Sequence, residues 1–134
     1  MKRLVLAILT VAALAVPVCA QPPAAVVDIP FGFMAGNAAM PAGSYTVNIP
    51  ADSSWVGLVD PDLHTHLLNG IPGGNPSGPN APVLVFHRYG DQYFLSEIRT
   101  PSRSRELRES PMEREAETTA SAGRANREVV LAMR

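Results

Sequence analysis

The residues of this chain with the clearest potential for chemistry are its three histidines. His64 and His66 are one residue apart, so in a strand both imidazoles lie on the same face, within reach of one metal ion. His87 becomes a third ligand if its own strand lies beside theirs, and Asp60 or Asp62 would complete the three or four ligands that zinc prefers. The pattern predicts a candidate zinc site with His64, His66 and His87 as ligands. The alternative is that an exposed His-x-His pair binds nothing.

The sequence VLVFHRYGDQYFLSEI at residues 83–98 contains His87 next to Arg88 and close to Asp91. Gly-Asp between two β-rich runs predicts a two-residue type II′ hairpin turn, which places His87 and Arg88 on opposite faces and Asp91 in the turn. We therefore expect His87 to pack beside Phe94 and Arg88 to lie over Tyr93 as a cation–π pair. Because catalysis needs groups that converge in a pocket, we assign no catalytic residue and expect a folding core here.

Residues 1–20, MKRLVLAILTVAALAVPVCA, have the pattern of a cleaved signal peptide. Lys2 and Arg3 precede an apolar run at 4–16, and the small residues of Val-Cys-Ala at 18–20 suit a cleavage site after Ala20. Two alternatives are a short membrane anchor and a lipoprotein modified at Cys19. The apolar run is too short to span a hydrocarbon core of about 30 Å comfortably. We expect export to the periplasm or the cell exterior, with no integral membrane segment after cleavage.

The chain after residue 20 contains no cysteine, so its stability would depend on burial rather than on disulfides. It carries nine arginines against twelve carboxylates, a formal charge of −3. This balance argues against nucleic-acid binding, which needs a basic surface. A cysteine nucleophile is excluded after cleavage, and no serine lies in a Gly-x-Ser-x-Gly sequence.

Short runs of β-forming residues between turn residues predict an antiparallel β domain over residues 26–100, after a disordered leader at 21–25. The expected strands are 26–33 (interrupted by Pro30), 44–49, 55–59, 63–68 and the hairpin at 83–98. The Gly/Pro-rich stretch 69–82 predicts a loop, either a binding loop or a tolerated insertion, and we favour the insertion. The hairpin is apolar on both faces, which is typical of a strand pair covered on two sides. The fold class predicted is a small antiparallel β-sandwich or partly open barrel with a short charged helix near the C-terminus.

Residues 101–127 form a charged segment that we expect to be helical or a linker. Ser110 at the cap position, Pro111 in the first helical position and acidic residues in the first turn predict a helix start. The arginines of this segment alternate with glutamates, so a solvated charged surface is favoured over a grip on an anionic polymer. Residues 128–134 return to β-forming residues and predict a last strand of the same domain.

Three stretches, VDIPFGFMAGNAAMPAGSYTV, LVFHRYGDQYFLSEIRT and SRELRESPMEREA, resemble a family of small exported proteins found in Acidobacteria and related soil bacteria. The resemblance covers most of residues 26–115, and the hairpin phrase is its most specific part. It implies export and a β-rich fold. It assigns no activity, ligand or catalytic residue.

We therefore expect a non-catalytic exported protein with no cofactor, which serves as a binding or structural module of the cell envelope or matrix and has an envelope or protein partner. The alternative function is a small metal-dependent hydrolase that uses zinc bound by His64, His66 and His87.

Overall fold

The computed structural model describes residues 25–50, 52–74, 76–78, 81–121 and 127–134. The predicted signal peptide at 1–20 and residues 21–24 of the predicted leader lie outside this part of the chain. Ala25 is not part of a disordered leader, because it begins a strand and pairs with Val47.

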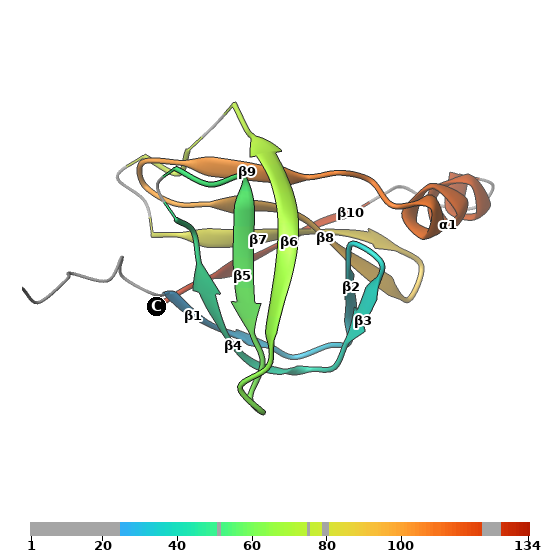
Figure 1. Ribbon diagram of the computed structural model, residues 1–134. Coiled ribbons are helices and arrows are strands. Elements are labelled where there is room, and N and C mark those ends of the chain that lie inside the picture. The colour runs from blue at the N-terminus through green and yellow to red at the C-terminus, as the bar shows by residue number, and fades with distance from the viewer. Residues whose placement is uncertain (1–24, 51, 75, 79–80, 122–126) are drawn as a thin grey trace, which may run out of the picture.

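The described chain is mainly β with a single short helix near the C-terminus, as the sequence predicts (Figure 1). The elements are β1 (Ala25–Ile29), β2 (Phe33–Ala35), β3 (Ala38–Met40), β4 (Gly43–Asn48), β5 (Trp55–Val59), β6 (Thr65–Pro72), β7 (Val83–Tyr89), β8 (Gln92–Arg99), β9 (Ser104–Leu107), α1 (Pro111–Ser121) and β10 (Arg127–Ala132).

The strands form one rolled sheet that does not close. Its order is β1-β4-β5-β6-β9-β8, and β7 and β10 continue it beyond β8, while the β2–β3 hairpin joins β8 at Met34 and Phe94. The two ends of the sheet meet where Val26 and Arg134 exchange backbone hydrogen bonds of 3.0 and 2.7 Å. In Figure 1, β5 and β6 cross β7, β8 and β9 at a steep angle, and the C-terminus lies beside β1. This is the predicted sandwich-like, partly open barrel.

The inner face of the rolled sheet is the main core. In β4, alternation places Tyr45 and Val47 inside, and both are buried. Phe86 of β7 is fully buried, and Phe33 lies edge-on against both Tyr45 and Phe86, with ring centroids 5.4 Å away in each case. Phe31 is stacked on the ring of Tyr93 at 3.8 Å. Edge-to-face and offset ring pairs of this kind contribute about 0.5–1.5 kcal/mol beyond simple burial.

The β7–β8 hairpin has the predicted register at its turn end and a bulge further along. His87 pairs with Phe94 and Phe86 with Leu95, as a two-residue turn at Gly90-Asp91 requires. The same register would place Glu97 opposite Leu84, but Glu97 pairs with Val85. Ser96 is the extra residue of this bulge. Gly90 has φ +62°, and Asp91 is outside the positive-φ region, as a type II′ turn requires. The predicted cation–π pair is also present, with the Arg88 guanidinium carbon 5.4 Å from the centroid of the Tyr93 ring.

Two predicted boundaries are wrong. The segment 69–82 is not all loop, because β6 continues through Asn69 to Pro72 and pairs with β9. The segment 101–127 is not all helix or linker, because Ser104–Leu107 forms β9 between β6 and β8. A Cβ at Gly70 would lie only 3.2 Å from the Arg105 Cβ, so the close approach of these two strands favours glycine there.

The outer face of the sheet at β7 and β8 is covered in two places. Helix α1 begins at the predicted Ser110 cap, whose Oγ accepts the backbone N–H of Glu113 at 3.1 Å, and the helix contacts β7. At the other end of the strands, the chain after β6 is tied down by backbone hydrogen bonds from Gly73 to Ser104 and from Ser77 to Thr100. Val85, Tyr89 and Phe94 of this face are buried, and Tyr89 contacts both Phe94 and Glu113 of α1. The hairpin is therefore buried on both faces, in keeping with its apolar sequence.

Candidate functional site

The structure does not bring the three predicted metal ligands together. His64 and His66 lie at the turn between β5 and β6, and both imidazoles contact Asp60. His87 lies in β7, and in the sheet order β9 and β8 separate that strand from β6. Both ring nitrogens of His87 already have partners, Glu113 and Ser96. His64, His66 and His87 therefore do not form the joint zinc site that the sequence predicts.

The β5–β6 turn is held by the Asp60 carboxylate. Its Oδ1 accepts the backbone N–H of His64 at 2.8 Å, and its Oδ2 lies 3.1 Å from His66 Nε2 and 3.4 Å from His64 Nδ1. The backbone of Leu63 has φ 65°, a conformation that L-residues adopt rarely, and this tight turn carries His64 back toward Asp60. Ligand atoms of Asp60, Asp62 and His64 lie within 4.8 Å of one another.

The electrostatics of Asp60 favour its ionised form. Desolvation is the largest single effect and raises the pKa, but the hydrogen bonds from His66 and from the His64 backbone together outweigh it and hold the pKa of Asp60 below its ordinary value. Asp60 is therefore a carboxylate at neutral pH, with one oxygen fixed by the backbone.

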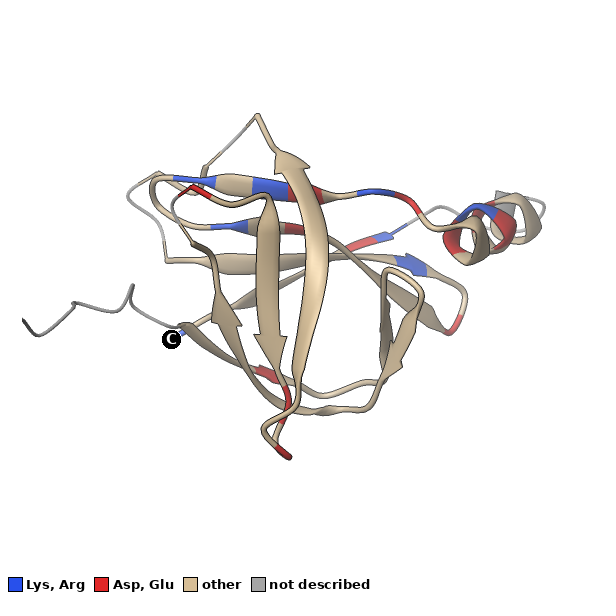
Figure 2. Cartoon of the chain, viewed as in Figure 1, with Lys and Arg blue, Asp and Glu red and all other residues tan. Residues whose placement is uncertain are grey.

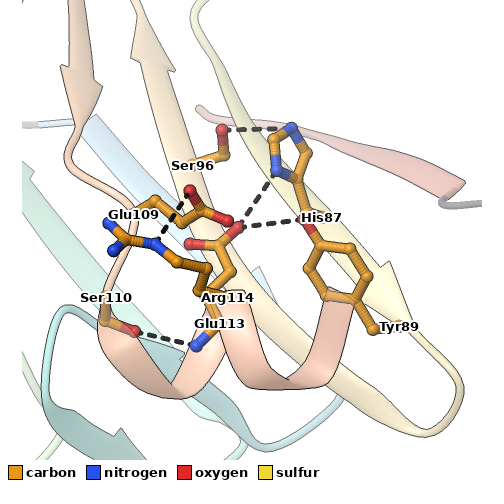
Figure 3. A network of polar contacts seen from close by, with 7 residues as sticks. All are labelled: His87, Tyr89, Ser96, Glu109, Ser110, Glu113 and Arg114. Atoms are coloured by element: carbon orange, nitrogen blue, oxygen red, sulfur yellow. Dashed lines mark hydrogen bonds and ion pairs between the residues drawn. The ribbon is translucent and has the colours of Figure 1, made fainter. Parts of the chain in front are cut away.

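A second polar network joins helix α1 to the hairpin (Figure 3). Glu113 projects from the first turn of the helix, and its Oε1 lies 3.1 Å from His87 Nδ1 and 3.4 Å from the Tyr89 hydroxyl, which donates to it. On the far side of the ring, His87 Nε2 lies 3.2 Å from Ser96 Oγ. When Glu113 is ionised it can only accept, so Nδ1 carries the proton and Nε2 is free to accept from Ser96.

Glu113 is the buried acid of this network, with its side chain 7% exposed. Burial raises its pKa, while the contacts with His87 oppose that rise without cancelling it. The acidic residues of segment 101–127 are predicted to form a solvated charged surface, and this is wrong for Glu113, which is buried. No motif in the sequence includes Ser96. No local signal in the sequence pairs Glu113 with His87, because the contact joins residues that are 26 positions apart.

The order Ser96–His87–Glu113 matches that of a nucleophile, a base and an orienting acid, so the network must be tested against hydrolase chemistry. Acyl transfer also needs a cavity at the serine hydroxyl with donors for the developing oxyanion. The larger cavity found, of about 590 Å³, lies between the hairpin turn and α1. A second one, of about 250 Å³, lies beside Pro111 and Leu68. Neither of these two cavities is lined by Ser96 or His87. Because Glu113 of α1 bonds to both His87 and Tyr89 of β7, we interpret the network as the attachment of α1 to the sheet.

The outer face of β4, β5 and β6 has a different character. Trp55, Leu67 and Ile71 are 48%, 65% and 40% exposed, and all three project outward from neighbouring strands. Trp55 pairs with Asn69, which lies between Leu67 and Ile71 on β6, and Leu67 pairs with Gly57. Figure 2 shows that β4, β5 and β6 carry no charged residue, whereas charges are frequent on β9, β10 and α1. We call the outward side chains of Trp55, Leu67, Asn69 and Ile71 the Trp55 face.

Comparison with known proteins gives no relative: no protein-family model, curated protein or solved structure matches the chain. Among the described residues, no helix has the length and apolar character needed to cross a membrane.

Proposed function

We propose that this chain is an exported, non-catalytic binding module that attaches to an uncharged polysaccharide of the cell envelope or matrix through the Trp55 face. The signal-like sequence at 1–20 supports the export part of this proposal.

The observation that carries the proposal is an exposed tryptophan on an uncharged sheet face. Large apolar side chains in this position lose the free energy of burial, about 25 cal/mol per Å² of apolar surface, unless a ligand covers them. Three of the six large hydrophobic residues with high exposure in the described chain belong to the Trp55 face. Their clustering on neighbouring strands supports a binding surface, since surface hydrophobic residues without a function are usually scattered singly.

The chemistry of the Trp55 face favours a sugar polymer over other occupants. The indole ring offers a flat, electron-rich face to the weakly positive C–H groups of a pyranose ring. The amides of Asn48 and Asn69 and the hydroxyl of Thr65 supply donors and acceptors for sugar hydroxyls. An anionic polymer is disfavoured, because β4, β5 and β6 carry no arginine or lysine and the exposed Glu106 of β9 pairs with Ile71. The nearby Arg105 guanidinium is already bonded to the carbonyls of Ser53 and Ser104.

The polar side chains that could perform catalysis are bonded to one another, and this supports the non-catalytic part of the proposal. His87, Glu113 and Ser96 bond to one another and hold α1 on the sheet. His66 is engaged with Asp60.

Cosedimentation with cellulose, an uncharged polysaccharide, tests this function. The untagged chain should sediment with cellulose and remain in solution with soluble polygalacturonate, an anionic polymer. Trp55→Ala should weaken binding by about 2 kcal/mol or more, roughly thirtyfold in affinity, as truncation of a central aromatic usually does. Val130→Ala removes a similarly exposed apolar side chain from β10 and should bind like the wild type. Equal binding by the Trp55 and Val130 variants, or no binding to cellulose, would contradict the proposal.

A further inference from the structure

Four metal-ligating side chains lie in or next to the turn between β5 and β6, on the far side of β9 and β8 in the sheet order from the His87 network. Two are carboxylates, Asp60 and Asp62, and two are imidazoles, His64 and His66. We propose that this turn binds one zinc ion in a closed site, with Asp60, Asp62, His64 and His66 as its four ligands.

Two separations between ligand atoms, both made by Asp60 Oδ2, are close to those around a tetrahedral ion. Zinc bonds to imidazole nitrogen and carboxylate oxygen are about 2.0–2.1 Å long, so neighbouring ligand atoms in a tetrahedron lie about 3.3 Å apart. Asp60 Oδ2 lies 3.1 Å from His66 Nε2 and 3.4 Å from His64 Nδ1. The ligand atoms of Asp60, Asp62 and His64 fall within 4.8 Å of one another. His66 lies outside that group and contacts it through Asp60 Oδ2, so a four-ligand shell needs the His66 ring and the exposed side chains of Asp62 and His64 to turn toward a common centre.

The surroundings orient Asp60 for this role. Its Oδ1 is held by the backbone N–H of His64 at 2.8 Å, which leaves Oδ2 directed at both imidazoles. In metal sites, hydrogen bonds of this kind to a ligating carboxylate fix the position and orientation of the ligand. The two imidazoles come from different settings, His66 from strand β6 and His64 from the turn, yet both meet the same oxygen.

The ligand set also selects the class of ion. Two imidazoles disfavour calcium and magnesium, which take oxygen ligands, and favour zinc or copper. A zinc ion binds only a ring nitrogen that carries no proton, so the ion and the proton compete for each imidazole. Zinc binding therefore releases a proton and weakens as the pH falls.

A closed set of four protein ligands has a structural consequence. No coordination position remains for a water or a substrate, so the ion fastens the turn instead of catalysing hydrolysis. The ion would bind the end of β5 to the start of β6 and hold Leu63 in its unfavourable backbone conformation. This assignment replaces the hydrolase that was based on His64, His66 and His87.

Zinc titration of the untagged, metal-free full chain tests the site. Calorimetry above the ordinary imidazole pKa should give about one zinc ion per chain and a higher Tm, whereas calcium should give neither effect. In ¹⁵N spectra of the histidine rings, zinc should shift the resonances of His64 and His66 and leave those of His87 in place. The double variant His64→Gln/His66→Gln should lose at least a hundredfold in zinc affinity, and the matched variant His87→Gln should bind zinc as the wild type does.

The outcomes that would overturn the proposal are distinct from a folding failure. The first test uses the wild-type chain. If it shows no saturable zinc binding, the proposed site is refuted. Zinc binding retained in the double variant would place the ion elsewhere. Zinc-induced shifts at His87 would restore the ligand set that includes His87.

Discussion

Replacement of Glu113 by alanine should release helix α1 from the sheet. The buried carboxylate accepts from His87 Nδ1 and from the Tyr89 hydroxyl, and alanine removes both bonds and leaves the donors of the sheet without this partner. A hydrogen bond to a charged group contributes about 1.5–3 kcal/mol, and a neutral one about 1 kcal/mol. The desolvation that raises the Glu113 pKa offsets part of this gain, so we expect a net loss of about 2 kcal/mol.

Hydrogen exchange measured by mass spectrometry locates this loss. Amides of Pro111–Ser121 should exchange about thirtyfold faster in Glu113→Ala, since about 2 kcal/mol corresponds to that factor, while amides of β4 and β5 keep their protection. Glu115→Ala is the matched control, because Glu115 is exposed on the same helix. Urea unfolding of both variants measures the total change in stability. If the two variants exchange alike, the polar network does not hold the helix.

The pH dependence follows from the same carboxyl group. Because burial raises the Glu113 pKa above its ordinary value of 4.5, the native state binds this proton more tightly than the unfolded chain does. The stability that Glu113 contributes through this proton is fully present when the pH is below the ordinary pKa of 4.5, and it is lost as the pH rises through the folded-state pKa of Glu113. The stability of the wild type relative to Glu113→Gln should therefore fall as the pH rises across that window. Asp60 and Glu97, whose pKa values are lowered, act in the opposite sense: their contribution is present above the ordinary values and is lost as the pH falls.

Three further predictions concern the hairpin. Phe86→Ala should destabilise the fold by about 3–5 kcal/mol in urea unfolding, because the ring is fully buried against two other phenylalanines; a loss below about 1 kcal/mol would contradict the core assignment. Gly90→Val should lower Tm far more than Asp91→Asn, since only position 90 has positive φ, and equal effects would refute the turn type. Ser96 should not react with a fluorophosphonate probe; its labelling, detected by mass spectrometry, would assign nucleophilic chemistry to the Ser96–His87–Glu113 network.

The sequence predicted the elements whose signals are local. Strict alternation located β4, and Gly90-Asp91 set the turn and the register of the pairs next to it. The Ser110-Pro111 pair located the helix start, because capping depends on neighbouring residues.

The features that local patterns missed depend on distant partners. Gly70 and Pro72 are typical of turns, yet they continue β6 because β9 pairs with that strand. Residues 104–107 have a charged sequence that suits a surface segment, and only their position between β6 and β8 makes them a strand. The candidate sites follow the same rule: Asp60, His64 and His66 are close in sequence and were considered together, whereas the Glu113 partner of His87 comes from a different element.

The fluorescence of Trp55 tests the proposed function most directly, because it is the only tryptophan in the chain and lies at the proposed binding surface. Titration with soluble cello-oligosaccharides should give a saturable change in its emission, and Leu67→Ser should weaken the apparent affinity while Val130→Ser leaves it unchanged. Emission that stays constant while the chain still sediments with cellulose would place the binding surface elsewhere, and would contradict the assignment of the Trp55 face.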